Sequence, residues 1–127
     1  MSATGCHVQL FASTPAAALR WRLLSGNNRE IGRGAEFFPD AESCRIAVKD
    51  LQTALDDLVP AVRRESGHAW VWQLSFGDRV VATSAHGYDR LIRCERGMSQ
   101  FRVEMRTARV GDVVMISQTR RWGGSYA

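Results

Sequence analysis

The sequence has little of several features that define whole classes of proteins. It contains three cysteines, three prolines and a single lysine, and no apolar run long enough to cross a bilayer. An odd number of well-separated cysteines argues against a disulfide-stabilised secreted domain. The first residues lack the basic start and apolar stretch of a signal peptide. We therefore expect a cytoplasmic protein with no membrane contact.

The patterns of common active sites are also missing. There is no Gly-rich phosphate loop, no dinucleotide fingerprint and no carboxylate pair typical of a general acid and base. Cys44 and Cys94 fall on the apolar stripes of predicted helices and should be buried and inert, whereas Cys6 should react readily. His68 and His86 have no Cys or His at metal-ligand spacing. We expect neither an enzyme nor a cofactor or metal.

What the chain does contain is enough for one globular domain. Its 127 residues are 45% hydrophobic and 24% charged, which is ordinary for a soluble protein. Alternating apolar residues and turn signals predict strands, and apolar residues at helical spacing predict two helices. The expected strands are 8–11, 19–23, 30–37, 59–64, 70–76, 80–84 and 110–117, and the expected helices are 40–58 and 89–107.

The order of these elements repeats along the chain. At an offset of fifty, Cys44 corresponds to Cys94 and Ala47 to Gly97, and each pair lies within a predicted helix. At fifty-one, Trp21 corresponds to Trp72, so both indoles should occupy equivalent buried positions. The small residues Ala47 and Gly97 should mark where each helix lies closest to the sheet.

The second half carries a family resemblance. The matching residues are Trp72-Gln73-Leu74, Gly77-Asp78, Val80-Val81-Ala82-Thr83-Ser84, Tyr88 and Gly97-Met98. This arrangement resembles the YegP-like family of small bacterial domains, although Gly34 stands in the first half where the second has Ser84. The resemblance implies an α+β fold in which tandem β-β-β-α-β repeats form one mostly antiparallel sheet, with both helices on one face and terminal strands exchanged. It implies no activity, because the family has no established one.

These boundaries describe a single domain, 1–127, built of repeats at about 7–58 and 59–117 and followed by a tail, 118–127. The charge is uneven along the chain: residues 1–60 hold six basic and seven acidic groups, and residues 61–127 hold eleven and six. A basic half is consistent with anionic partners. Sixteen of the seventeen cations are arginine, however, and such a skew also follows from genome composition.

Two kinds of binding module remain as hypotheses. The favoured one is a non-catalytic module for a protein partner or for self-association, which uses the sheet face that the helices leave open. The alternative is weak, sequence-tolerant binding of RNA or single-stranded DNA by the basic second repeat, where Trp70 could stack on bases. The residues proposed for these surfaces together are Arg20, Arg22, Arg63, Arg64, Trp70, Val71, Gln73 and Arg79.

Overall fold

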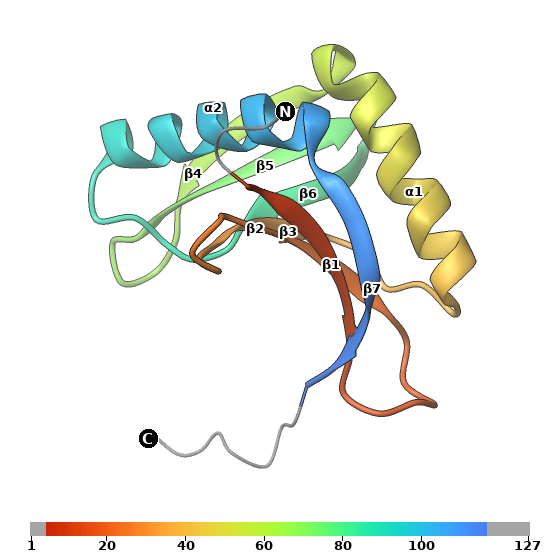
Figure 1. The fold of residues 1–127 in the computed structure, drawn as a ribbon. Coiled ribbons are helices and arrows are strands. Elements are labelled where there is room, and N and C mark those ends of the chain that lie inside the picture. Colours follow the sequence, from red (N-terminus) through yellow and green to blue (C-terminus); the bar gives the residue numbers. More distant parts are fainter. Residues whose placement is uncertain (1–4, 117–127) are drawn as a thin grey trace.

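The computed structural model describes residues 5–116, which form one sheet and two helices (Figure 1). In chain order the elements are β1 (His7–Ala12), β2 (Arg20–Leu24), β3 (Glu30–Gly34), α1 (Ala41–Ala54), a 3-10 turn η1 (Leu55–Asp57), β4 (Val59–Arg64), β5 (Trp70–Phe76), β6 (Arg79–Ser84), α2 (Leu91–Thr107) and β7 (Arg109–Met115). None of the helices in residues 5–116 is both long and apolar enough to cross a membrane. The predicted tail, 118–127, lies outside the described residues.

The seven strands lie in the order β4-β5-β6-β3-β2-β1-β7. All neighbours are antiparallel except β1 and β7, which run parallel. Strand β7 belongs to the second half of the chain but pairs with β1, the first strand of the first half. Both helices pack on the same face of the sheet, where residues of both enter a single core (Figure 1). The predicted α+β fold is confirmed.

Local sequence explains most element boundaries. Strands β4 and β5 have the bounds expected from the sequence, and Asn28 and Gly77 take positive φ in the turns that join their flanking strands. Helix α1 starts after Asp40, whose carboxylate accepts a 2.7 Å hydrogen bond from the Ser43 amide. The α-helix ends at Ala54 instead of reaching residue 58, because the last turn tightens into η1 before β4.

The junction of the two halves is the pairing of β3 with β6. Gly32 lies opposite Ser84 and Gly34 lies opposite Ala82. In the sequence, Gly32 and Ala82 are fifty residues apart, as are Gly34 and Ser84. Exchanging the two halves of the chain therefore turns each pair into the other, and the register stays the same. The first and second halves thus meet about a local pseudo-twofold axis. This register agrees with the two-repeat interpretation, which stays a prediction.

The centre of the core is formed by three aromatic rings from both halves. Trp21 and Trp72 are 2% and 0% exposed, as expected for equivalent buried positions. Phe101 of α2 lies between them, with ring centroids 6.1 Å from Trp21 and 5.0 Å from Trp72. Gly32 makes this packing possible, because a Cβ there would lie 2.7 Å from Phe101 Cδ1 and 2.8 Å from Trp72 Cη2.

The three thiols are all buried, which corrects one expectation. Cys44 and Cys94 lie in the core as predicted, and burial raises the pKa of both, that of Cys44 to about 11. Cys6 is only 6% exposed, so the expectation of an accessible thiol there is wrong. Since side chains two apart share a face of an extended chain, Cys6 joins Val8 and Leu10 in the core.

The small residue of α2 lies against an aromatic ring that is joined to the sheet. At Gly97 the nearest neighbour is the ring of Tyr88, in the segment before α2, and the backbone of Tyr88 pairs with Trp70 of β5. A Cβ at position 97 would lie 2.8 Å from Tyr88 Cζ and closer still to the hydroxyl. The corresponding residues of the first half are Ala47 and Phe38, which lacks a hydroxyl. The close approach at Gly97 is therefore to the Tyr88 ring, and the corresponding expectation for Ala47 stays a prediction.

Candidate binding surfaces

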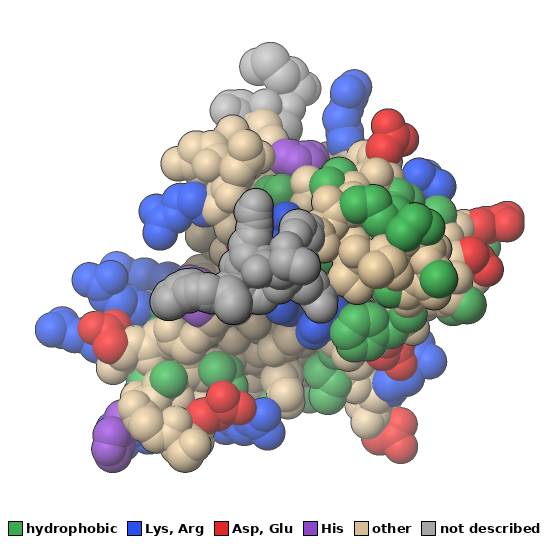
Figure 2. Space-filling model, turned by 90° about the horizontal axis from the view of Figure 1, so that it is seen from below, with side chains coloured by type: hydrophobic (Ala, Val, Ile, Leu, Met, Phe, Trp, Pro, Cys, Tyr) green, Lys and Arg blue, Asp and Glu red, His purple; other side chains and the backbone are tan. Residues whose placement is uncertain are grey.

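The open face of the sheet, which the helices leave uncovered, holds five of the eight predicted binding residues. Strand alternation and register place Arg20 and Arg22 of β2, Arg63 of β4, and Val71 and Gln73 of β5 on this face. Seen from below, most blue side chains of Lys and Arg stand around the outline of the molecule, and a few blue atoms are visible nearer the middle (Figure 2). Arg63 was expected with Trp70 on the other proposed surface, and the prediction that the open face binds a partner stays a prediction.

The other three predicted residues lie elsewhere. Arg64 and Trp70 are on the helix side of the sheet edge, where Trp70 packs against the core and the Arg64 guanidinium lies 5.5 Å from its ring centre. Arg79 forms an ion pair of 3.4 Å with Glu36 beside α1. Of the basic groups predicted to surround Trp70, Arg64 lies over its ring. Arg63 is on the opposite face, and Arg79 is paired with Glu36.

A row of polar side chains crosses the open face. Successive cross-strand partners are Gln9 of β1, Arg22 of β2, Arg33 of β3, Thr83 of β6 and Gln73 of β5. Since strands in a sheet are spaced about 4.8 Å apart, the row extends about 19 Å. Arg22 and Arg33 are direct cross-strand neighbours in this row. Like charges in that position destabilise a sheet unless an opposite charge offsets them.

Arg22 is held in a fixed position by its neighbours on β1. Its Nε and Nη2 atoms donate hydrogen bonds of 2.9 and 2.6 Å to the Gln9 side-chain oxygen. Its guanidinium lies 4.9 Å from the centre of the Phe11 ring, in a cation–π arrangement. The fork of this arginine is therefore oriented before any ligand arrives.

Arg20 is oriented in the same manner. Its Nε donates a 2.7 Å hydrogen bond to the Gly34 carbonyl, and its guanidinium lies 5.1 Å from the centre of the Phe37 ring. Burial lowers the pKa of Arg20, the charge of Arg33 lowers it further, and Glu30 opposes the shift. The surroundings of Arg20 therefore disfavour the charged form of its side chain.

Glu30 supplies the negative charge among these arginines. Its carboxylate lies 2.5 Å from Arg33 Nε and 3.6 Å from Arg22 Nη1. Within residues 5–116 no carboxylate lies within 4.0 Å of Arg20. Three positive groups are therefore balanced by one negative group on this part of the open face. We call Arg20, Arg22, Arg33 and Glu30 the arginine cluster.

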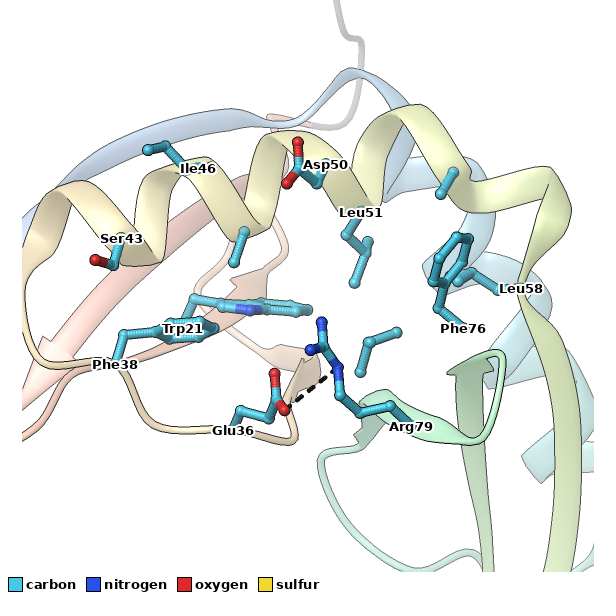
Figure 3. Close-up of a pocket in the computed structure, with 13 residues that line it drawn as sticks. Trp21, Glu36, Phe38, Ser43, Ile46, Asp50, Leu51, Leu58, Phe76 and Arg79 are labelled. Carbon is cyan, nitrogen blue, oxygen red and sulfur yellow. Dashed lines mark ion pairs between the residues drawn. The ribbon is translucent and has the colours of Figure 1, made fainter.

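A second surface is a cleft beneath α1, of about 280 Å³ (Figure 3). Its lining is Trp21, Glu36, Phe38, Ser43, Ile46, Ala47, Asp50, Leu51, Ala54, Leu58, Phe76, Arg79 and Val81. The Trp21 indole lies between α1 and the Glu36–Arg79 ion pair, so one side of the cleft is aromatic and apolar and the other is charged (Figure 3). Sequence reasoning missed this cleft because its walls come from distant segments.

The second half has a broader groove at the corresponding place. Its lining is Ser25, Asn27, Arg29, Glu30, Ile31, His86, Gly87, Tyr88, Asp89, Arg90, Ile92, Arg93, Arg96, Gly97 and Gln100. Arg29 and Arg96 line this groove. At an offset of fifty residues, Arg29 corresponds to Arg79 of the cleft and Arg96 corresponds to Ile46. The second groove is basic and wide, whereas the first is apolar and narrow, so the two halves present different chemistry from similar positions.

No group of His, Cys, Asp or Glu side chains in residues 5–116 is arranged to hold a metal ion. The expectation of a protein without metal or catalytic residues stays a prediction.

Comparison with known proteins identifies similar folds. No family model and no curated protein matches the chain. YegP of E. coli, a protein of unknown function, superposes with a TM-score of 0.72 at 13% identity, over 92% of this chain and 99% of that one. A UPF0339 protein from Shewanella oneidensis gives 0.70 at 13% identity, over 95% of this chain and 99% of that one. The chain therefore has the YegP-like fold that its sequence resemblance implied.

Proposed function

We propose that this protein is a non-catalytic binding module that takes an apolar side chain of a protein partner into the cleft beneath α1. The observation that carries the proposal is the cleft itself. Its volume of about 280 Å³ is at the lower end of ligand-site volumes, so it suits one bulky side chain better than a whole cofactor. Binding of one buried anchor residue in a pocket is how many protein interfaces obtain most of their energy.

The charges around the cleft define the partner further. Glu36 and Asp50 line it with carboxylates, and Arg79 is the only cation among its lining residues. Phe76, which lines the cleft, is 55% exposed and offers an apolar contact surface. The matching ligand is a peptide segment with an aromatic or branched aliphatic residue next to a basic one.

Two further observations favour the cleft over other roles. The thiols of Cys44 and Cys94 are buried with raised pKa, which is the opposite of an activated nucleophile. Trp70, on which the nucleic-acid alternative for the second half relied, has the Arg64 guanidinium over its ring. These features favour the cleft over the other candidate sites of the sequence analysis.

The test is a selection of displayed peptides on the immobilised protein, followed by affinity measurements with two variants. Phe76→Ser alters the cleft, and Phe37→Ser is its matched control, since Phe37 is 63% exposed but does not line the cleft. We expect selected peptides that pair a bulky apolar residue with Lys or Arg. Their affinity should fall at least tenfold with Phe76→Ser and stay unchanged with Phe37→Ser.

Two results would overturn the proposal: no enrichment of peptides over an unrelated protein, or equal affinity for both variants. Sedimentation of the free protein tests self-association. A dimer that Phe76→Ser dissociates would identify a second copy of the chain as the partner.

A further inference from the structure

We propose that the arginine cluster on the open face of the sheet binds single-stranded nucleic acid. This site is independent of the cleft beneath α1, which opens on the helix side of the sheet. It also differs from the sequence-based alternative, because its cations come from the first half of the chain, where the net charge is lower. The proposal depends on where the arginines are, and not on how many the chain has.

The charge of the cluster is the first argument. Three guanidinium groups share the single carboxylate of Glu30, which bonds to Arg33 and lies near Arg22. The side chains of Arg22 and Arg33 are only 26% and 30% exposed, so water screens their mutual repulsion less than it would on a fully exposed surface. A phosphate group beside them would relieve that repulsion.

Pre-organisation is the second argument. Gln9 and Phe11 fix the position of Arg22, and the Gly34 carbonyl and Phe37 fix that of Arg20. Within residues 5–116 these contacts use only the Nε atom of Arg20, so its two Nη groups remain as donors. Donors that are already oriented lose less side-chain entropy on binding, and the guanidinium fork matches a phosphate oxygen pair.

The shape of the surface favours an extended strand over a small anion. The polar row from Gln9 to Gln73 extends about 19 Å, which is several nucleotides of a stretched single strand. The Gln9 amide nitrogen, the Gln73 amide and the Thr83 hydroxyl oxygen, whose proton is donated to the Trp72 carbonyl, add neutral groups that base edges can use. Arginine planes can stack on bases. An acidic peptide offers carboxylates but has no bases for these neutral groups and guanidinium planes.

The experiment measures fluorescence anisotropy of a labelled twelve-nucleotide RNA of mixed sequence, with the full chain, at about 50 and 150 mM salt. The test variant combines Arg20→Gln, Arg22→Gln and Arg33→Gln. The control combines Arg90→Gln, Arg93→Gln and Arg96→Gln in the groove of the second half, and it changes the net charge equally. Circular dichroism verifies that both variants are folded.

We expect the test variant to lose at least tenfold in affinity and the control less than threefold. The dependence of log affinity on log salt should become shallower by about 2 in the test variant, because each phosphate contact of a single strand contributes about 0.7. If the test variant fails to fold, Glu30→Gln serves instead, and it should tighten binding several-fold because it removes the one negative charge of the cluster.

Three outcomes would overturn the proposal. The first is no binding by the unaltered protein at about 50 mM salt. The second is an equal loss in test and control variants, which would show that net charge alone attracts RNA. The third is displacement of the RNA by a twelve-residue polyglutamate at matching charge concentration, which would identify the ligand as an acidic peptide.

Discussion

At the scale of the residue, the contact of Gly97 with Tyr88 explains a difference between the two halves of the chain. A Cβ at position 97 would overlap the phenol ring, so Gly97→Ala should destabilise the protein by about 1–3 kcal/mol despite the better helix propensity of alanine. In a Tyr88→Phe background the same change should cost about 1 kcal/mol less, because the nearest atom is gone. Urea unfolding of the four proteins measures this coupling.

The double variant Gly97→Ala with Tyr88→Phe has the same two residue types that the first half has at the corresponding positions, Ala47 and Phe38. Equal costs of Gly97→Ala in both backgrounds would contradict a role for the Tyr88 hydroxyl. A stabilising effect of Gly97→Ala alone would show that the ring moves aside freely.

The thiol of Cys44 predicts how stability responds to alkaline pH. Burial raises its pKa from 9.0 to about 11, so folding favours the neutral thiol. This contribution is fully present below pH 9 and is lost as the pH rises through about 11, since the unfolded chain releases the proton more easily. Unfolding free energies between pH 7 and 11 should therefore fall more steeply for the natural protein than for Cys44→Ala. Parallel curves for the two would refute this.

At the scale of the element, the Gln52 side chain links the two helices by hydrogen bonds. The Gln52 amide of α1 donates hydrogen bonds of 2.9 Å to the carbonyls of Met105 and Ala108 at the end of α2. These carbonyls lack an intrahelical partner because the helix stops there. Gln52→Leu keeps the size of the side chain but leaves them unpaired, and we expect it to cost about 1–3 kcal/mol.

The matched control for this prediction is Gln100→Leu, which makes the same substitution at an exposed position of α2. Its effect on the unfolding free energy should stay within about 0.5 kcal/mol. Thermal and urea unfolding measure both variants. Similar small effects for the two would show that water replaces the Gln52 amide without loss.

Elements were also the scale at which the sequence was most informative. The two-residue alternation in β2 and β5 placed Arg22 and Gln73 on the open face correctly, because face depends only on local geometry. It could not reveal that Arg22 and Arg33 are cross-strand neighbours, because register depends on how distant strands pair. Cys6 was misjudged for a related reason, since its burial depends on its contacts with the folded core.

The cleft beneath α1 illustrates the same limit at a larger scale. Ile46 and Phe76 are far apart in the sequence, and each alone is simply an exposed apolar residue. Only the packing of α1 beside the β5–β6 turn brings them into one lining. Helical spacing predicted which residues of α1 face the core, but not that the adjoining space would remain partly open.

At the scale of the whole molecule, the two halves should fold as one unit. The sheet is continuous from β3 to β6, and β7 of the second half completes the edge beside β1. Phe101 contacts both Trp21 and Trp72, so the core cannot be divided between the halves. Removal of this ring by Phe101→Ala should cost about 3–5 kcal/mol and should loosen both indoles together.

Urea unfolding followed by tryptophan fluorescence and by far-ultraviolet circular dichroism tests this cooperativity. The two signals should give one coincident transition in the natural protein, and Phe101→Ala should shift both by the same amount because no half retains a core of its own. Val103→Ala, at a position of α2 that is 67% exposed, should leave the transition within about 0.5 kcal/mol of its original free energy. Two separate transitions, or a shift confined to one signal, would mean that the repeats are independent folding units despite their shared sheet.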